Sequence, residues 1–169
     1  MERSSRVVEH PGESRARWKS EWSARMLLGE FRHALDAKGR LFVPSRWRDE
    51  LTGNVVVSRW MEHCLALMTT ARFQEIADAV KERSHNNEAG RHYSRALFSR
   101  ASEEQVDRQG RLSIPASLRE WSGLGDEAVL AGVSDHVEIW APAAWEEYHA
   151  QMDGQFEEMA AKLDAELHR

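Results

Sequence analysis

The chain has 169 residues, of which 41% are hydrophobic and 30% charged, a composition typical of one globular domain or of two small repeats. No apolar run approaches the roughly 18–20 residues that span a bilayer, and residues 1–25 lack the apolar segment of a secretion signal. Cys64 is the only cysteine, which excludes an intramolecular disulfide, and we therefore expect a cytoplasmic protein.

The formal net charge of −5 comes from the carboxyl-terminal end of the chain. From Glu146 to Arg169 there are seven acidic and two basic residues, whereas the preceding residues balance at 21 of each. The net charge therefore does not exclude a basic, nucleic-acid-binding surface on the rest of the chain.

The first 25 residues combine Arg, Glu and Ser with Pro11 and Gly12 and show no apolar period, which predicts a disordered extension. Patterned apolar sequence begins at Met26. Met26 is thus an alternative start of the natural product, which amino-terminal sequencing would test.

A charged turn followed by an apolar strand occurs twice, as DAKGRLFVP (36–44) and DRQGRLSIP (107–115). Over 36–48 and 107–119, six of thirteen positions are identical, and weaker matches continue toward the end of each unit. Such spacing predicts an internal structural repeat. The identical pairs are Asp36/Asp107, Gly39/Gly110, Arg40/Arg111, Leu41/Leu112, Pro44/Pro115 and Arg48/Arg119.

Both units predict the same order of elements: strand, glycine turn, strand, short helix, two further strands and a longer helix. In the first unit these are 29–35, Gly39, 40–43, 45–51, 54–59, 64–68 and a helix from Ala71. In the second unit they are 101–106, Gly110, 111–114, 116–121 stopping at Gly123, 127–133, 136–140 and a helix from Pro142.

Residues 88–101 predict a helix that joins the two units, with Tyr93, Leu97 and Phe98 facing inward. One unit of about 45 residues buries too little apolar surface to fold alone, so we expect one pseudo-twofold body. The predicted segments are an extension (1–25), a first repeat (26–87), a linking helix (88–101), a second repeat (102–150) and an acidic tail (151–169). Apolar residues at helical spacing in the tail suggest that it frays or packs against a neighbour.

Two interpretations of the charged turns remain open. Asp36 and Arg40, like Asp107 and Arg111, stand four residues apart, so each pair can simply stabilise its turn. Alternatively the arginine contacts a ligand, because its rigid fork of donors suits phosphate and guanine and a two-stranded ribbon fits the major groove. Five bases against two acids between Gly29 and Arg48 favour the first turn as the stronger nucleic-acid surface.

Catalysis and metal binding are not predicted. Asp36 and Asp107 lie on turns with no Ser, Cys or His placed beside them by sequence, and the eight histidines form no H-x₃-H pair. We predict no catalytic residue, no metal site and no cofactor, and hence not an enzyme. Arginines 91, 95 and 100 on the linking helix are either a solvated face or part of a DNA track.

The segments DAKGRLFVPSRWR and DRQGRLSIPASLR resemble the doubled DxxxR signature of the MraZ family, bacterial transcriptional regulators related to AbrB-type swapped-hairpin proteins. The resemblance begins at MLLGEFRHALDAKGR and continues to VEIWAPAAWEEY, leaving the first 25 residues and the acidic tail outside it. It implies an α+β, mainly β fold: a double-split β-barrel of two AbrB-like repeats, with short helices and a carboxyl-terminal helix.

The resemblance further implies a nucleoid-associated repressor of its own operon and of the division and cell-wall gene cluster, which binds short direct repeats in double-stranded DNA as a ring-shaped homo-oligomer. Carried over to this chain, Lys38 and Arg40 would contact DNA, and Arg111 would be a secondary or structural counterpart. We add Arg32, from the same basic stretch, to the predicted contacts, and assign Asp36, Gly39, Asp107 and Gly110 to the structure of the turns. Gln109 stands where the first unit has Lys38, which weakens the case for two equal DNA-binding turns.

A ring has its own physical rationale. A few phosphate contacts per subunit bind weakly, but linked subunits that reach successive repeats raise the effective concentration of each next contact. Such repeats should recur near one helical turn, roughly 10 bp. The main alternative is a structural or protein-interaction module whose charged turns bind an acidic protein partner.

Overall fold

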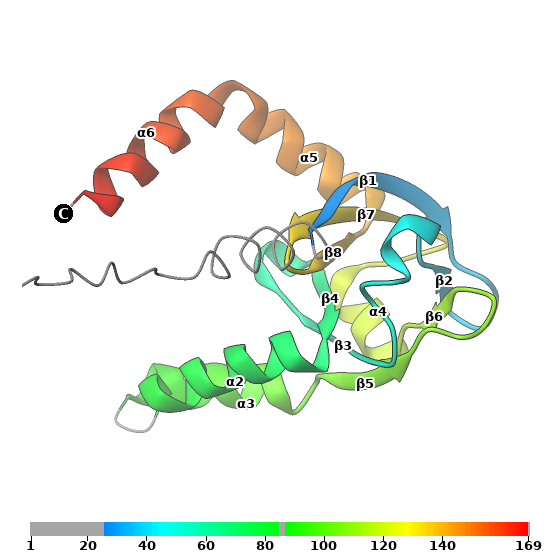
Figure 1. Cartoon of the computed structure of the whole chain (residues 1–169). Helices are drawn as coiled ribbons and strands as arrows, with labels where there is room; N and C mark the ends of the chain where they lie inside the picture. The colour runs from blue at the N-terminus through cyan, green and yellow to red at the C-terminus, as the bar shows by residue number, and fades with distance from the viewer. Residues whose placement is uncertain (1–25, 85–86, 169) are drawn as a thin grey trace, which may run out of the picture.

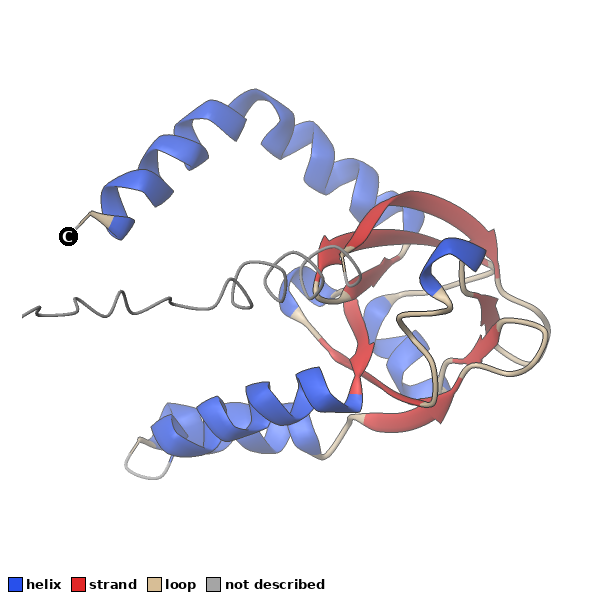
Figure 2. Cartoon of the chain, in the orientation of Figure 1, coloured by secondary structure: helices blue, strands red, loops and turns tan. Residues whose placement is uncertain are grey.

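A computed structural model describes residues 26–84 and 87–168, so the extension predicted for residues 1–25 lies outside the described residues. The fold is α+β, with antiparallel strands forming the body and helices on its outside (Figures 1 and 2). The strands are β1 (Leu27–Ala34), β2 (Arg40–Phe42), β3 (Asn54–Arg59), β4 (Leu65–Thr69), β5 (Ser102–Gln105), β6 (Arg111–Ser113), β7 (Glu127–Ser134) and β8 (Val137–Trp140). The helices are α2 (Thr70–Ser84), α3 (Glu88–Phe98), α4 (Ala116–Ser122), α5 (Pro142–Met152) and α6 (Phe156–Leu167), with 3-10 turns η1 (Ser45–Trp47), η2 (Met61–His63) and η3 (Asp153–Gln155).

One six-stranded sheet is shared by both halves of the chain. Its order is β1-β7-β8-β4-β3-β5, and exchanging each strand with its counterpart in the other half reproduces the same order in reverse. The first strand of each half pairs with the third strand of the other half, as β1 with β7 and β5 with β3. Neither half completes the sheet alone, which is the arrangement that the burial argument requires.

A separate two-stranded ribbon, β2 with β6, closes the body beside this sheet. Leu41 and Leu112 are paired at its centre, and both are fully buried. Because side chains alternate along a strand, their neighbours Arg40, Phe42 and Arg111 point the other way, toward solvent. The ribbon therefore seals the apolar core with one face and presents polar residues with the other.

The prediction of a short helix over residues 45–51 is wrong. Only the 3-10 turn η1 forms, with the Trp47 N–H donating to the Pro44 carbonyl at 2.9 Å. The Trp47 indole is buried, donates to the Leu28 carbonyl at 3.2 Å and packs edge-on against Phe31, a set of contacts with a distant segment that the local pattern does not reveal. In the second half α4 does form and ends at Gly123, whose φ of 68° suits a left-handed cap, as predicted.

The linking helix α3 begins after the cap residue Asn87, whose side chain accepts from the Ala89 N–H at 2.9 Å. Leu97 is buried and Phe98 packs edge-on against Phe73, but Tyr93 is 41% exposed, so its predicted inward orientation is wrong. The reason is the position of Tyr93: α2 and α3 form a hairpin that extends beyond the sheet, where α2 is the one described element that covers α3 (Figure 1).

The long helices α2 and α5 begin at Thr70 and Pro142, at or next to the predicted starts. Beyond α5 the chain continues through η3 into α6, and this arm projects from the body on the same side as the α2–α3 hairpin (Figure 1). Across the described ranges, no helix combines the length and the apolar character needed to cross a membrane.

Candidate nucleic-acid interface

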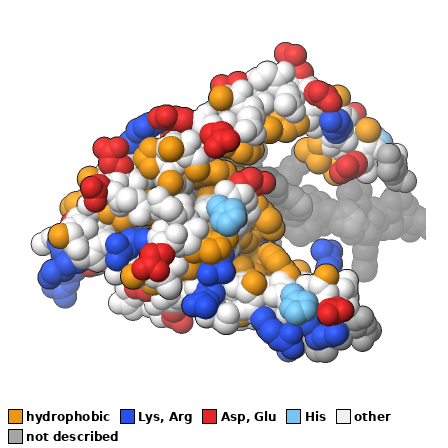
Figure 3. Space-filling model, turned by 180° about the vertical axis from the view of Figure 1, so that it is seen from behind, with side chains coloured by type: hydrophobic (Ala, Val, Ile, Leu, Met, Phe, Trp, Pro, Cys, Tyr) orange, Lys and Arg blue, Asp and Glu red, His pale blue; other side chains and the backbone are white. Residues whose placement is uncertain are grey.

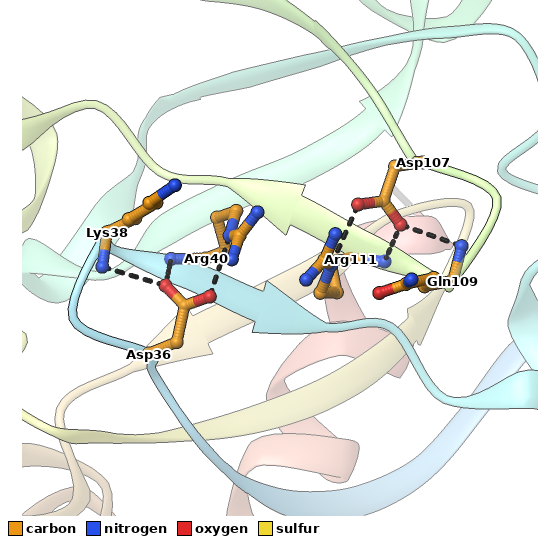
Figure 4. Close-up of polar contacts among 6 residues, drawn as sticks. All are labelled: Asp36, Lys38, Arg40, Asp107, Gln109 and Arg111. Atoms are coloured by element: carbon orange, nitrogen blue, oxygen red, sulfur yellow. Dashed lines mark hydrogen bonds and ion pairs between the residues drawn. The ribbon is translucent and has the colours of Figure 1, made fainter.

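The outer face of the β2–β6 ribbon brings together the two charged turns. Arg40 lies opposite Ser113, and Phe42 lies opposite Arg111, so both arginines stand on the same face with one turn at each end (Figure 4). Phe42 is 43% exposed on this face. The repeat in the sequence thus becomes a ribbon that carries one arginine from each half.

The first turn is organised by a single carboxylate. Oδ1 of Asp36 accepts from the backbone N–H of Lys38 at 2.9 Å and of Arg40 at 3.0 Å, while Oδ2 accepts from Arg40 Nε at 2.6 Å (Figure 4). The Gly39 N–H closes the turn onto the Asp36 carbonyl at 2.9 Å. Three donors thus hold the carboxylate in place.

The second turn repeats this geometry. Asp107 Oδ1 accepts from the backbone N–H of Gln109 at 2.8 Å and of Arg111 at 2.9 Å, and Oδ2 accepts from Arg111 Nε at 2.8 Å (Figure 4). Gln109 replaces Lys38 without changing the turn, because only the backbone N–H of this residue bonds to the carboxylate. The difference between the turns lies in the side chains that they present, not in their backbone.

Each carboxylate orients its arginine side chain through the Nε donor and does not bond to the terminal Nη groups. Each aspartate takes the Nε donor, and within the described part of the chain the terminal Nη groups of Arg40 and Arg111 have no hydrogen-bond acceptor. Their side chains are 29% and 23% exposed. A fork held by one edge and open at the other is pre-organised for a second acceptor such as a phosphate or a guanine base.

The pKa of the Asp36 carboxyl is lowered below the ordinary 3.8, chiefly because the carboxylate accepts a hydrogen bond from the backbone N–H of Arg40. The Arg40 side chain and the Lys38 N–H lower this pKa further, whereas partial desolvation raises it. The Arg111 and Gln109 groups lower the pKa of Asp107 in the same way. Because the charged form is favoured in the folded state, its contribution to stability is complete above the ordinary pKa and is lost as pH falls through the lowered one.

This sign leads to a testable prediction for Asp36→Asn, which keeps the oxygen acceptor but removes the charge. We expect its melting temperature to lie below that of the parent by a constant amount from neutral pH down to about pH 5, and the difference to shrink below the ordinary pKa of 3.8. Thermal unfolding followed by circular dichroism at several pH values measures it. A difference that stays constant to the acid limit would show that the charge has no part in the turn.

Two further arginines, Arg48 and Arg119, lie beneath the turns and were not among the predicted site residues. Arg119 Nε donates to the Ile114 carbonyl at 3.1 Å, and its guanidinium packs under Gly39 of the other half. Arg48 Nε donates to the Val43 carbonyl at 2.9 Å, and its guanidinium packs under Gly110. The sequence did contain a signal for these two residues: both halves have an arginine at this matched position of the repeat. An arginine shared by the two halves outside the turn indicates that it makes the same contact in both.

The other predicted contacts lie in different places. Lys38 is exposed at the tip of the first turn, beside the ribbon. Arg32 lies on β1, away from the ribbon, where its Nη2 forms a 2.9 Å ion pair with Glu146 on α5. The exposed arginines of the linking segment, 91, 95 and 100, belong to the α2–α3 arm rather than to the ribbon. The structure therefore joins Lys38, Arg40 and Arg111 and leaves Arg32 apart.

No cluster of three or more His, Cys, Asp or Glu side chains suited to a metal ion occurs among residues 26–84 and 87–168. The chemistry that the ribbon offers is recognition by guanidinium and ammonium donors and by one exposed aromatic ring. Such a surface suits a polyanion with regularly spaced acceptors.

The sequence model of the family described as "MraZ protein, putative antitoxin-like" matches the chain twice, over residues 26–96 and 97–166. Among curated proteins, the transcriptional regulator MraZ of Roseiflexus sp. (strain RS-1) is 43% identical over 142 residues, which are 84% of this chain and 99% of the relative. Its namesake in Salinispora tropica is 43% identical over 131 residues (78% and 92%), and that in Thermobifida fusca is 39% identical over 138 residues (82% and 96%). The two matches and these relatives show that the chain belongs to the MraZ family.

Proposed function

We propose that this chain is a sequence-specific, DNA-binding transcriptional regulator whose β2–β6 ribbon contacts the major groove. The observation that carries the proposal is the pair of oriented arginines, Arg40 and Arg111, on one exposed face with open terminal donors. The names of the curated relatives, each a transcriptional regulator, support the same role.

A two-stranded ribbon is narrow enough to enter the major groove, where arginine forms paired hydrogen bonds with guanine O6 and N7. In this arrangement Arg40 and Arg111 read bases, and Lys38 and Arg108, which extend from the two turns, contact flanking phosphates. Phe42 on one strand occupies the position that Ser113 occupies on the other, so the ribbon is symmetric in backbone but not in side chains. This asymmetry gives the bound protein a direction, as direct repeats require.

The remaining features of the proposal follow the family resemblance. The chain acts as a repressor of its own operon and of the division and cell-wall gene cluster, is associated with the nucleoid, and binds short direct repeats as a ring-shaped homo-oligomer. Its body is a double-split β-barrel of two repeats, at 26–87 and 102–150, joined by residues 88–101. The reversible strand order of the shared sheet supports this description.

The experiment is a binding titration on the DNA upstream of the protein's own gene, repeated at several salt concentrations. Phosphate contacts release counterions, so the logarithm of the binding constant should fall linearly with the logarithm of the salt concentration, with a slope of about −0.9 for each phosphate contacted. A strong slope together with preference for the upstream DNA over scrambled DNA of equal length supports the proposal. A flat dependence would instead favour the acidic-protein module.

A further inference from the structure

The helix α6 is amphipathic and lies at the end of the arm formed by α5, η3 and α6 (Figure 1). Every one of its residues is exposed, including Phe156 at 74%, Leu163 at 59% and Leu167 at 75%. Isolated helices shorter than about 12–15 residues are marginal in water, and most helices in proteins owe their stability to packing of an apolar face. A helix of 12 residues with such a face therefore gains stability from a surface that covers it.

The apolar residues of α6 form one narrow stripe. At about 100° per residue, Phe156, Met159, Leu163 and Leu167 fall within an arc of about 80°. Asp164 and Glu166 flank this stripe on its two sides. The only base of the helix, at position 162, lies about 100° around the helix from the centre of the stripe and forms a 2.7 Å ion pair with the acid at position 158. The stripe is thus bordered by acidic groups, and the base lies outside it in an ion pair of its own.

A groove with complementary properties lies between α2 and α3. Its volume is about 330 Å³, and its walls include Ile76, Ala79 and Val80 from α2 and Tyr93 from α3. Three charged residues also line the groove: Arg83, and the pair of Arg72 with Glu75, which are joined by a 2.7 Å ion pair. The 15 residues of α2 extend about 22 Å, which accommodates the roughly 18 Å of α6.

The helix and the arm that contains the groove also carry opposite net charges. The segment from Phe156 to Leu167 carries four acids and one base, whereas Thr70 to Arg100 carries six bases and four acids. Figure 3 shows Lys and Arg side chains gathered over the α2–α3 arm. Docking of an apolar helix with acidic borders into an apolar groove on an arm of net positive charge buries the apolar side chains and brings opposite charges together at the rim.

We infer that α6 of one subunit docks into the α2–α3 groove of a second copy of this chain. The helix does not occupy its own groove, since all of its residues are exposed. Helix and groove are different surfaces, so each docked copy still offers a free groove or a free helix, and repeated docking closes into a ring when the rotation allows. This inference supplies the contact for the ring in the proposed function and rests on that part of it.

The test measures assembly of the full chain without DNA, by sedimentation velocity and native mass spectrometry. A helix variant, Phe156→Glu with Leu163→Glu, and a groove variant, Ala79→Glu with Tyr93→Glu, change only residues that are exposed in the subunit. We expect each variant alone to be monomeric at concentrations at which the parent assembles. The control Ala161→Glu with Ala165→Glu makes the same change in net charge on the opposite face of α6, at exposed positions, and should assemble like the parent.

Mixing the two variants gives the decisive result. The intact helix of the groove variant fits the intact groove of the helix variant, and no further copy can add, so a heterodimer of one copy each is expected. Either variant assembling like the parent, or a mixture that stays monomeric, would overturn the inference. Because no DNA is present, these outcomes are independent of whether the ribbon binds DNA; a parent ring that ignores the upstream DNA would defeat the proposed function alone.

Discussion

Replacing Arg40 and Arg111 together with alanine is expected to lower affinity for the upstream DNA by at least about thirtyfold, because each paired arginine–guanine contact is worth about 1–3 kcal/mol. In a ring the loss recurs at every bound subunit, so the assembled protein should lose the gel shift altogether. The melting temperature should fall only slightly, since the pairs with Asp36 and Asp107 lie at the surface. Quantitative binding and thermal unfolding on the same preparations measure both effects.

Two comparison variants make this result specific. Arg40→Lys keeps the charge but lacks the rigid fork that Asp36 orients, so it should retain salt-dependent binding and lose discrimination between the upstream DNA and scrambled DNA. Arg32→Ala removes the predicted contact outside the ribbon, and its effect should be smaller because Glu146 already pairs with this guanidinium. If the double alanine variant binds like the parent while folded and assembled, the arginines serve only the turns.

The second large effect concerns the glycine of the first turn. Gly39 has φ of 73°, and a Cβ built there would lie 2.7 Å from Cζ of Arg119. Gly39→Ala therefore combines a left-handed backbone, which costs about 1–2 kcal/mol, with a displacement of the flexible Arg119 side chain, which should add about 1 kcal/mol because its hydrogen bond to the Ile114 carbonyl is lost. Chemical denaturation of the variant measures the loss of the free energy of unfolding.

The chain contains a matched control for this prediction. Gly53 has the same φ of 73°, but a Cβ at this position would have nothing within 4 Å, so Gly53→Ala should carry the backbone cost alone. Adding Arg119→Ala to Gly39→Ala removes the obstacle, and a double-mutant cycle should show a favourable coupling of up to about 1 kcal/mol. Equal losses for the two alanine variants, with no coupling to Arg119, would refute the role of the guanidinium beneath the turn.

Local patterns predicted most of the elements, because strand alternation and turn chemistry are encoded over a few residues. The turn of 107–111 and the cap at Gly123 are examples in which residue type alone specifies the backbone. The predicted helix over 45–51 was wrong because Trp47 is held by Leu28 and Phe31, which are distant in sequence. The predicted burial of Tyr93 was wrong because periodicity identifies an apolar face but not whether the subunit itself covers that face.

The candidate site was predictable in part for similar reasons. The repeat placed Arg40 and Arg111 at matched positions, but it did not reveal that they share one face of a ribbon, which depends on the register of β2 with β6. Nor did the basic stretch containing Arg32 reveal that this side chain points to α5 instead. Counting charges along a chain cannot resolve such differences, because strand pairing decides which charges meet.

Photo-crosslinking tests most directly whether the ribbon is the DNA-binding surface. Phe42 lies on the ribbon and is 43% exposed, and His92 lies on α3 of the α2–α3 arm, outside the lining of its groove, with its side chain 68% exposed. Each would be replaced separately by p-benzoylphenylalanine, and the protein irradiated in complex with the upstream DNA. Crosslinking to DNA from position 42 and not from position 92 is the predicted result. DNA crosslinked from position 92 but not from position 42 would contradict the account, because the arginines of the linking helix would then carry the contact.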